Sequence, residues 1–90
     1  MKLNQKTRAK WLKERHGLWW STSQLDKLSD EVILEAVMNY GQWEDFLDLK
    51  QWWGLKKIKQ LFEQMMSKRR VNLRQPVQVL FHNYLAAHVH

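Results

Sequence analysis

Residues 30–40 constrain the fold more than any other stretch, because a helix formed by them is apolar on nearly every side. The segment reads DEVILEAVMNY and lies between Ser29 and Gly41. Ser29 is a typical helix N-cap, and Gly41 is a typical helix stop. Beyond the first turn the only polar side chains are Glu35 and Asn39, which are four residues apart on one line. Since a helix that is apolar almost all round is a buried one, the sequence predicts a central helix surrounded by others.

Three segments after Gly41 have helical periodicity. Residues 43–53 carry an apolar face made of Trp43, Phe46, Leu49 and Trp53. Residues 55–66 have the cleanest amphipathic pattern, made of Leu55, Ile58, Leu61, Phe62, Met65 and Met66. A last helix, at about 73–88, is expected to bury Leu73, Val77, Leu80, Phe81 and Tyr84, with Pro76 tolerated in its first turn. The predicted fold class is all-α: a compact bundle of four to five short helices around the central apolar helix.

The first 16 residues are predicted to form a basic arm or helix, ahead of a single helical domain over residues 17–90. A helix over residues 5–15 places Ala9 and Leu12 loosely on one side. Trp11 projects elsewhere on this helix. This apolar stripe is short, and Gly17 is expected to end the helix.

Six of the 90 residues are Trp, and 44% of the chain is apolar. Each indole buries roughly 150–250 Å², and so small a domain has trouble covering six of them. Trp52 falls on the polar side of its predicted helix, so we expect its ring to be exposed and surrounded by acids. Trp is enriched at the energetic centres of protein interfaces. The predicted partner surface consists of Trp52, Glu44, Asp45, Asp48, Trp11 and Trp20.

The net charge of +6 is unevenly distributed. Residues 1–20 carry six Lys and Arg against one Glu, residues 21–55 carry two against seven acids, and residues 56–90 carry seven against one Glu. Part of this charge is expected to pair internally. The candidates for contacts to nucleic-acid phosphates are Lys56, Lys57, Lys59, Lys68, Arg69, Arg70 and Arg74. Residues 47–66 also resemble a helix-turn-helix in outline, with a basic second helix.

The chain contains no catalytic signature, and we expect neither enzymatic activity nor a cofactor. Its three glycines are isolated, so they form no phosphate-binding loop. It has no Cys, and His82 and His88 lie on different faces of their helix, so a metal site is not expected. The absence of Cys suits a reducing cytosol, and no stretch approaches the roughly 20 apolar residues of a membrane span. These features predict a cytoplasmic protein without membrane partners.

Four motifs follow one another with the spacing of a known family: LWW at 18–20, SDEVILEAVMNYGQWEDF at 29–46, WGLKKIKQLF at 53–62 and RRVNLRQPVQVLFHNYL at 69–85. The order resembles a domain-of-unknown-function family of small all-α bacterial proteins. Genes of this family often lie beside nucleotidyltransferase toxins of the abortive-infection (AbiEii/AbiGii) type. The resemblance implies an antitoxin or accessory partner of such a toxin, and it supplies no established functional residues.

Three functions therefore stay open. The first is a protein-binding module, in its specific form an antitoxin that docks on a nucleotidyltransferase toxin and masks it. The second is a nucleic-acid-binding regulator that uses the basic residues between 56 and 74. The third is a self-associating structural protein, which makes a homo-oligomer a further partner to test.

Overall fold

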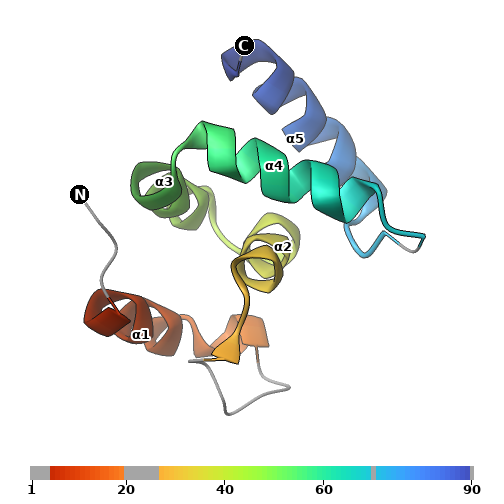
Figure 1. Ribbon diagram of the computed structural model, residues 1–90. Coiled ribbons are helices and arrows are strands. Elements are labelled where there is room, and N and C mark those ends of the chain that lie inside the picture. Colours follow the sequence, from red (N-terminus) through yellow and green to blue (C-terminus); the bar gives the residue numbers. More distant parts are fainter. Residues whose placement is uncertain (1–4, 20–26, 70, 90) are drawn as a thin grey trace.

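The predicted central helix is present as α2, Asp30–Tyr40, and the other elements pack around it (Figure 1). A computed structural model describes residues 5–19, 27–69 and 71–89 of the chain. Within these residues the chain is all-α, with five α-helices and one short 3-10 helix, η1, which confirms the predicted fold class.

Helix α2 begins and ends where the sequence predicts. The Ser29 hydroxyl accepts a hydrogen bond from the Val32 backbone N–H (3.2 Å), and the Gly41 N–H donates to the Val37 carbonyl (2.9 Å). A Cβ at Gly41 would lie 2.8 Å from that carbonyl oxygen, so the position requires glycine. The buried apolar side chains of α2 are Ile33, Leu34, Val37 and Met38. Val32 and Tyr40 are exposed, contrary to prediction, because the neighbouring elements cover the other sides of α2.

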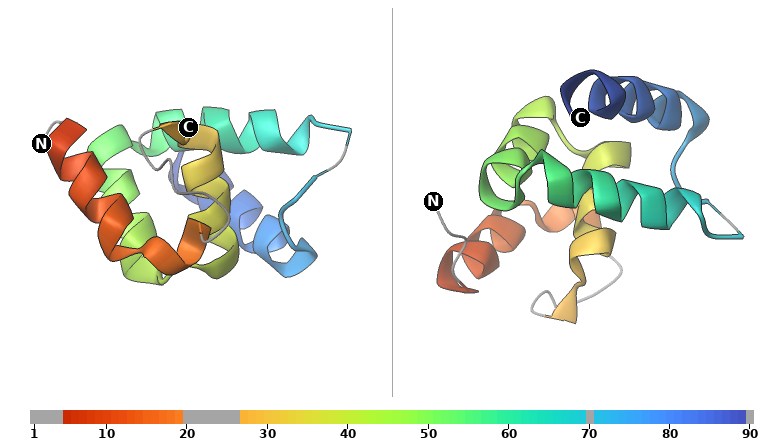
Figure 2. Two further views of the ribbon diagram at one scale, coloured as in Figure 1. Left: turned by 90° about the horizontal axis from the view of Figure 1, so that it is seen from below. Right: turned by 45° about the horizontal axis from the view of Figure 1, so that its top comes forward.

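Helix α1, Gln5–Glu14, and η1, His16–Trp19, share the core with α2. The predicted inward stripe of α1 is right at Leu12 and wrong at Ala9. Ala9 is exposed, whereas Trp11 is buried together with Leu12. The reason is that α1 lies alongside the third helix of the bundle, which Trp11 faces (Figures 1 and 2). The N-terminal basic segment is therefore a helix that packs into the core.

Helices α3, Trp43–Trp53, and α4, Leu55–Met66, are separated by Gly54 alone. Gly54 has φ +82° and ψ 153°, a backbone conformation that is nearly confined to glycine. The predicted core positions that are buried in these helices are Phe46, Leu49, Ile58, Phe62 and Met65. Trp43 was predicted in the same core, but 43% of its surface is exposed. It lies at the start of α3, where the bundle covers only one side of its ring.

Helix α5, Gln75–His88, lies against α4 (Figure 2) and carries Pro76 in its first turn, as predicted. Phe81 and Leu85 are its buried side chains. Leu80 was predicted to be buried but is 55% exposed. Because successive helical residues differ by about 100°, Leu80 falls at the edge of the stripe that Phe81 and Leu85 define.

The buried side-chain amide of Asn39 connects the C-terminal end of α2 to the segment that precedes α5. Asn39 was assigned to the polar line of α2, yet its side chain is buried. Its Oδ1 accepts from the Arg74 backbone N–H (3.0 Å), and its Nδ2 donates to the Asn72 carbonyl (3.2 Å). The Arg74 guanidinium in turn donates to the Asn39 carbonyl (2.6 Å). These bonds fix where α5 starts.

Among the helices of the described residues, none combines the length and the apolar character needed to cross a membrane.

Candidate protein-binding surface

The basic ends of the sequence pair with its acidic middle, as the charge pattern predicts. The ion pairs found within residues 5–19, 27–69 and 71–89 are Arg8–Asp30, Arg15–Asp45, Arg15–Asp48, Lys57–Asp30, Lys59–Glu63 and Lys68–Glu31. All but one of these join separate elements of the fold. Much of the charge that looked available to partners is therefore used inside the molecule.

Five side chains connect α1 to α3, and we call this cluster the α1–α3 joint: Trp11, Arg15, Asp45, Asp48 and Trp52. The Arg15 guanidinium donates to Asp45 (2.6 Å) and to Asp48 (3.3 Å), and it lies 4.1 Å from the Trp11 ring centroid. The Trp11 indole N–H donates to Asp48 (2.9 Å). The second oxygen of Asp45 accepts from the Gln42 backbone N–H (2.9 Å), which caps α3. Both acids are thus held by the chain itself.

The expectation that Trp52 stands in water is wrong. Its ring is partly buried and meets Trp11 edge-on, with centroids 5.3 Å apart. Trp11 is only 6% exposed, because its ring is enclosed by Arg15, Trp19 and Trp52. Helix α1 therefore occupies the surface on which a partner was expected to dock.

Two residues of the predicted partner surface are not among the side chains of the joint. Glu44 is exposed on α3 and has no ion pair within the described part of the chain. Trp20 lies outside the described residues. Partner binding at this surface stays a prediction, now with the added requirement that α1 move.

Some of the basic residues proposed to contact nucleic acid form ion pairs within the protein, and others do not. Lys57, Lys59 and Lys68 form the ion pairs given above. Lys56 and Arg69 are exposed, without an ion pair to any described residue, and Arg70 lies outside the described residues.

The helix-turn-helix resemblance is also weakened by geometry. Such motifs join their two helices by a turn of roughly three to four residues. Helices α3 and α4 are joined by one residue, Gly54. Arg74, the last of the proposed phosphate contacts, hydrogen-bonds the end of α2, and its guanidinium lies 5.4 Å from the Tyr40 ring centroid.

An exposed aromatic surface lies on α3 and α5. We call it the Trp43 face and define it by Trp43, Leu47, Leu80 and Tyr84. Trp43 stacks on Phe46 (centroids 5.0 Å apart) and meets Tyr84 edge-on (5.4 Å). Leu47 and Leu80 are both exposed. A contiguous apolar surface of this kind is typical of a binding site.

A hollow of about 220 Å³ opens between the Trp43 and Leu80 side chains. Met38, Phe46 and Phe81, which are themselves buried, contribute to its lining. The Trp43 ring therefore packs on the buried Phe46 and Phe81 rings, while 43% of the residue stays exposed. A side chain from another molecule could enter the hollow and cover the indole.

A cation stands at each end of this face. Lys50 lies two turns along α3 from Trp43, with its Nζ 6.0 Å from the Tyr84 ring centroid. Arg74 lies just before α5, and its side chain is held over Tyr40 by the hydrogen bond to α2. The face is thus apolar in the middle and positive at both ends.

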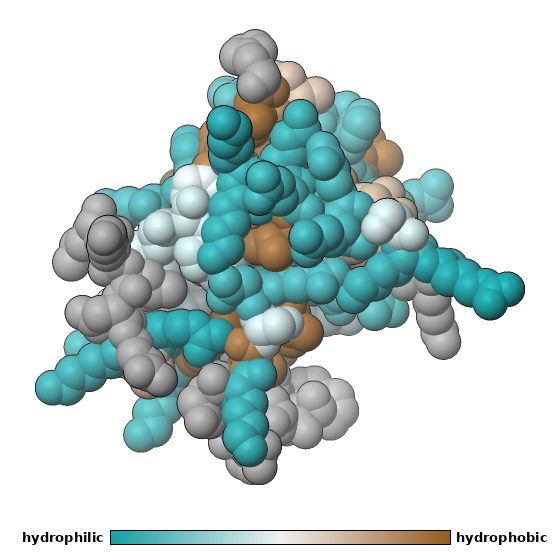
Figure 3. All heavy atoms as spheres, in the orientation of Figure 1, coloured by the Kyte–Doolittle hydropathy of each residue, from teal (hydrophilic) through white to brown (hydrophobic). Residues whose placement is uncertain are grey.

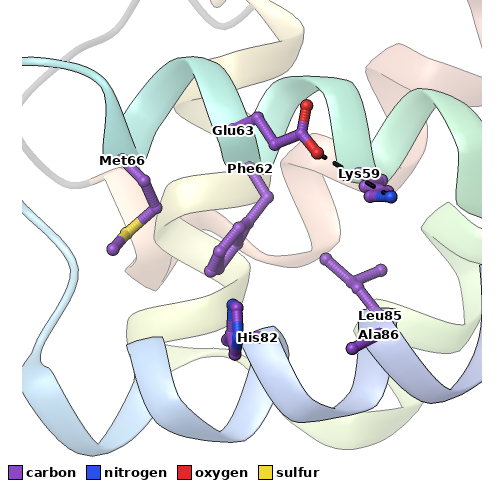
Figure 4. A pocket seen from close by; sticks show the side chains of 7 residues that line it. All are labelled: Lys59, Phe62, Glu63, Met66, His82, Leu85 and Ala86. Carbon is purple, nitrogen blue, oxygen red and sulfur yellow. Dashed lines mark ion pairs between the residues drawn. The ribbon is translucent and has the colours of Figure 1, made fainter.

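A second groove runs between α4 and α5, with a volume of about 390 Å³. Figure 4 shows Phe62 and His82 pointing toward each other across it, with the Lys59–Glu63 pair on the α4 side. Met66 borders the groove and is 37% exposed. The groove has an apolar lining, and its polar side chains do not converge on one point. Among the described residues no three His, Cys, Asp or Glu side chains gather to hold a metal ion.

The side of the molecule on which α4 faces the viewer is mainly hydrophilic, with small separate apolar areas (Figure 3).

The sequence contains a signal for the Trp43 face, although periodicity places Trp43 in the core. Trp43, Phe46 and Leu49 share one helical stripe, and periodicity alone cannot tell which member stands at the rim. The useful signal is position: Trp43 is the first residue of α3, immediately after the connection from α2.

No protein-family model, curated protein or solved structure matches this chain. The family resemblance drawn from the sequence motifs therefore stays a prediction.

Proposed function

We propose that this chain is a small helical protein-binding module and that its partner docks on the Trp43 face. The observation that carries the proposal is a Trp ring with 43% of its surface exposed, backed by the buried Phe46 and Phe81 rings. Rigid, supported aromatic side chains are the typical energetic centres of protein interfaces. Neither a cofactor nor a catalytic group is required for this role.

The Trp43 face is a better docking surface than the α1–α3 joint for an energetic reason. A partner that binds the joint must first displace Trp11 and Arg15 from the acids of α3. Breaking charge-assisted hydrogen bonds and uncovering a buried indole opposes such binding. A partner that binds Trp43 displaces only water.

In its specific form, the module is the antitoxin of a nucleotidyltransferase toxin and acts by masking it. This form rests on the sequence resemblance alone. Docking through an aromatic-centred surface fits that role, because masking requires only a stable contact over the partner's functional cleft.

The test is capture of the partner by the tagged chain in the cells that naturally produce it. Wild type, Trp43→Ala and Leu80→Ala are compared with Val79→Ala, a matched control that removes exposed apolar surface from the same helix. We expect one protein in stoichiometric amount with wild type and Val79→Ala, and loss of most of it with the other two. Equal recovery with all four chains contradicts the Trp43 face as the docking surface.

The two alternative functions are separated by independent measurements. Nucleic-acid binding through the exposed Lys56 and Arg69 should weaken steeply with added salt and be lost when both charges are reversed. Self-association should appear in light scattering of the purified chain as a mass above 11.0 kDa that Trp43→Ala lowers. A salt-insensitive complex of one chain with one partner protein supports docking instead.

A further inference from the structure

The charge around the Trp43 face is one-sided. From residue 64 to residue 90 the sequence contains no Asp or Glu, so α5 brings no negative charge to the surface. The exposed acid nearest in sequence is Glu44, beside Trp43. Asp45 and Asp48, the next acids along α3, are both held by Arg15. Lys50 and Arg74 therefore outnumber Glu44, the acid beside Trp43.

The two cations bracket the hollow along the chain. Arg74 comes six residues before Leu80, and Lys50 comes seven residues after Trp43. At a rise of about 1.5 Å per residue, Lys50 lies about 10 Å along α3 from Trp43. Trp43 and Leu80 both line the hollow.

The shape of the face favours a helical partner segment. The described residues form no strand, so they offer no open sheet edge to which an extended peptide could add. Three helices line the hollow: α2 with Met38, α3 with Trp43, and α5 with Leu80. A further helix packs on such a surface by inserting apolar side chains at positions i, i+3 or i+4, and i+7.

We infer that the partner presents an amphipathic helix whose apolar stripe fills the hollow beside Trp43 and whose acidic residues pair with Lys50 and Arg74. The inference rests on the proposed function and adds the chemical class of the partner to it. Acidic side chains at the two ends of the helix's apolar stripe would orient it along the face, because opposite charges speed and align docking.

A displayed library of random 16-residue peptides tests this directly. Selection runs on the immobilised wild-type chain, with Trp43→Ala used to remove peptides that bind elsewhere. We expect the retained sequences to be net acidic, with apolar residues at helical spacing. Against one such synthetic peptide, Lys50→Glu should weaken binding by about two- to fivefold, the range of an exposed ion pair, while Lys56→Glu leaves it unchanged.

The outcomes separate the inference from the proposed function. Retained peptides that depend on Trp43 but are basic, neutral or proline-rich overturn the acidic helix while leaving the Trp43 face intact. Equal affinity of Lys50→Glu and wild type for an acidic peptide also overturns it. A selection that returns no Trp43-dependent peptide contradicts the docking surface itself.

Discussion

The indole N–H of Trp11 donates a hydrogen bond to the carboxylate of Asp48, 2.9 Å away and 37 residues further along the chain. Arg15 contacts the same carboxylate and stacks on the same indole. This relationship fixes the basic N-terminal helix on the acidic helix α3. It also explains why Asp45 and Asp48 are held by the chain itself.

Trp11→Phe should destabilise the fold by about 1.5–3 kcal/mol, because it removes one hydrogen bond to a charged acceptor while keeping an aromatic ring in the core. Trp11→Ala should cost more, about 3–5 kcal/mol, because it also empties a buried site. Urea denaturation followed by circular dichroism measures both. Equal stability of the two variants would show that the ring is not part of the core.

Arg15→Lys tests the forked geometry of the α1–α3 joint. Lysine keeps the charge but cannot contact Asp45 and Asp48 while lying flat on Trp11, so we expect a loss of about 1 kcal/mol. Arg15→Ala should lose more, because it leaves the buried Asp45 without its cation. Arg69→Ala is the matched control on an exposed arginine without an ion pair to a described residue, and it should stay within about 0.5 kcal/mol of wild type. If Arg69→Ala is destabilised and Arg15→Ala is not, Arg15 does not hold α1 on α3.

The sequence predicted the all-α class, the central helix and most of the core, because these follow from helical periodicity over long segments. The pattern failed at Trp11, whose helix carries so few apolar residues that the stripe was ambiguous. It also failed at Trp52. This residue lies on the polar side of α3, yet it is partly buried because the basic helix α1 covers that side. Periodicity is a property of a single helix, whereas the burial of its side chains depends on which other helix packs against it.

Asn39→Ala should destabilise the protein by about 1–3 kcal/mol, because the Arg74 N–H and the Asn72 carbonyl both lose their side-chain partner at the end of α2. Asn83→Ala, on the exposed side of α5, serves as the control and should be nearly neutral. Chemical denaturation gives the free energies. Hydrogen exchange of the Arg74 amide should also accelerate in Asn39→Ala, and unchanged protection of that amide would argue against the hydrogen bond.

The three glycines form a matched set. Gly41→Ala should destabilise the fold because its Cβ would lie 2.8 Å from the Val37 carbonyl oxygen, and Gly54→Ala because of its φ of +82°. We expect losses of about 1–3 kcal/mol in each case. Gly17 has neither a close neighbour nor a positive φ, so Gly17→Ala should stay within about 0.5 kcal/mol of wild type. Thermal unfolding of the three variants measures their relative stability. The prediction is wrong if Gly17→Ala has the lowest melting temperature.

The Trp43 face was beyond the reach of periodicity for a related reason. Trp43 obeys the core stripe of α3, and Leu80 lies beside the core stripe of α5. Their exposure arises because the two helices meet through Phe46 and Phe81, leaving the larger rings and Leu80 at the rim. Only the packed structure shows that Trp43 and Leu80 stay exposed.

The order of solvent access among the indoles tests the account most directly, and it needs no partner. The ring signals of Trp11, Trp19, Trp43 and Trp52 can be assigned in nuclear magnetic resonance spectra by single Trp→Phe substitutions. A soluble paramagnetic probe then broadens each signal in proportion to its exposure. We predict the strongest broadening at Trp43, less at Trp52, and the least at Trp11 and Trp19. Stronger broadening at Trp52 than at Trp43 would contradict both the covering of the acidic helix by α1 and the choice of docking surface.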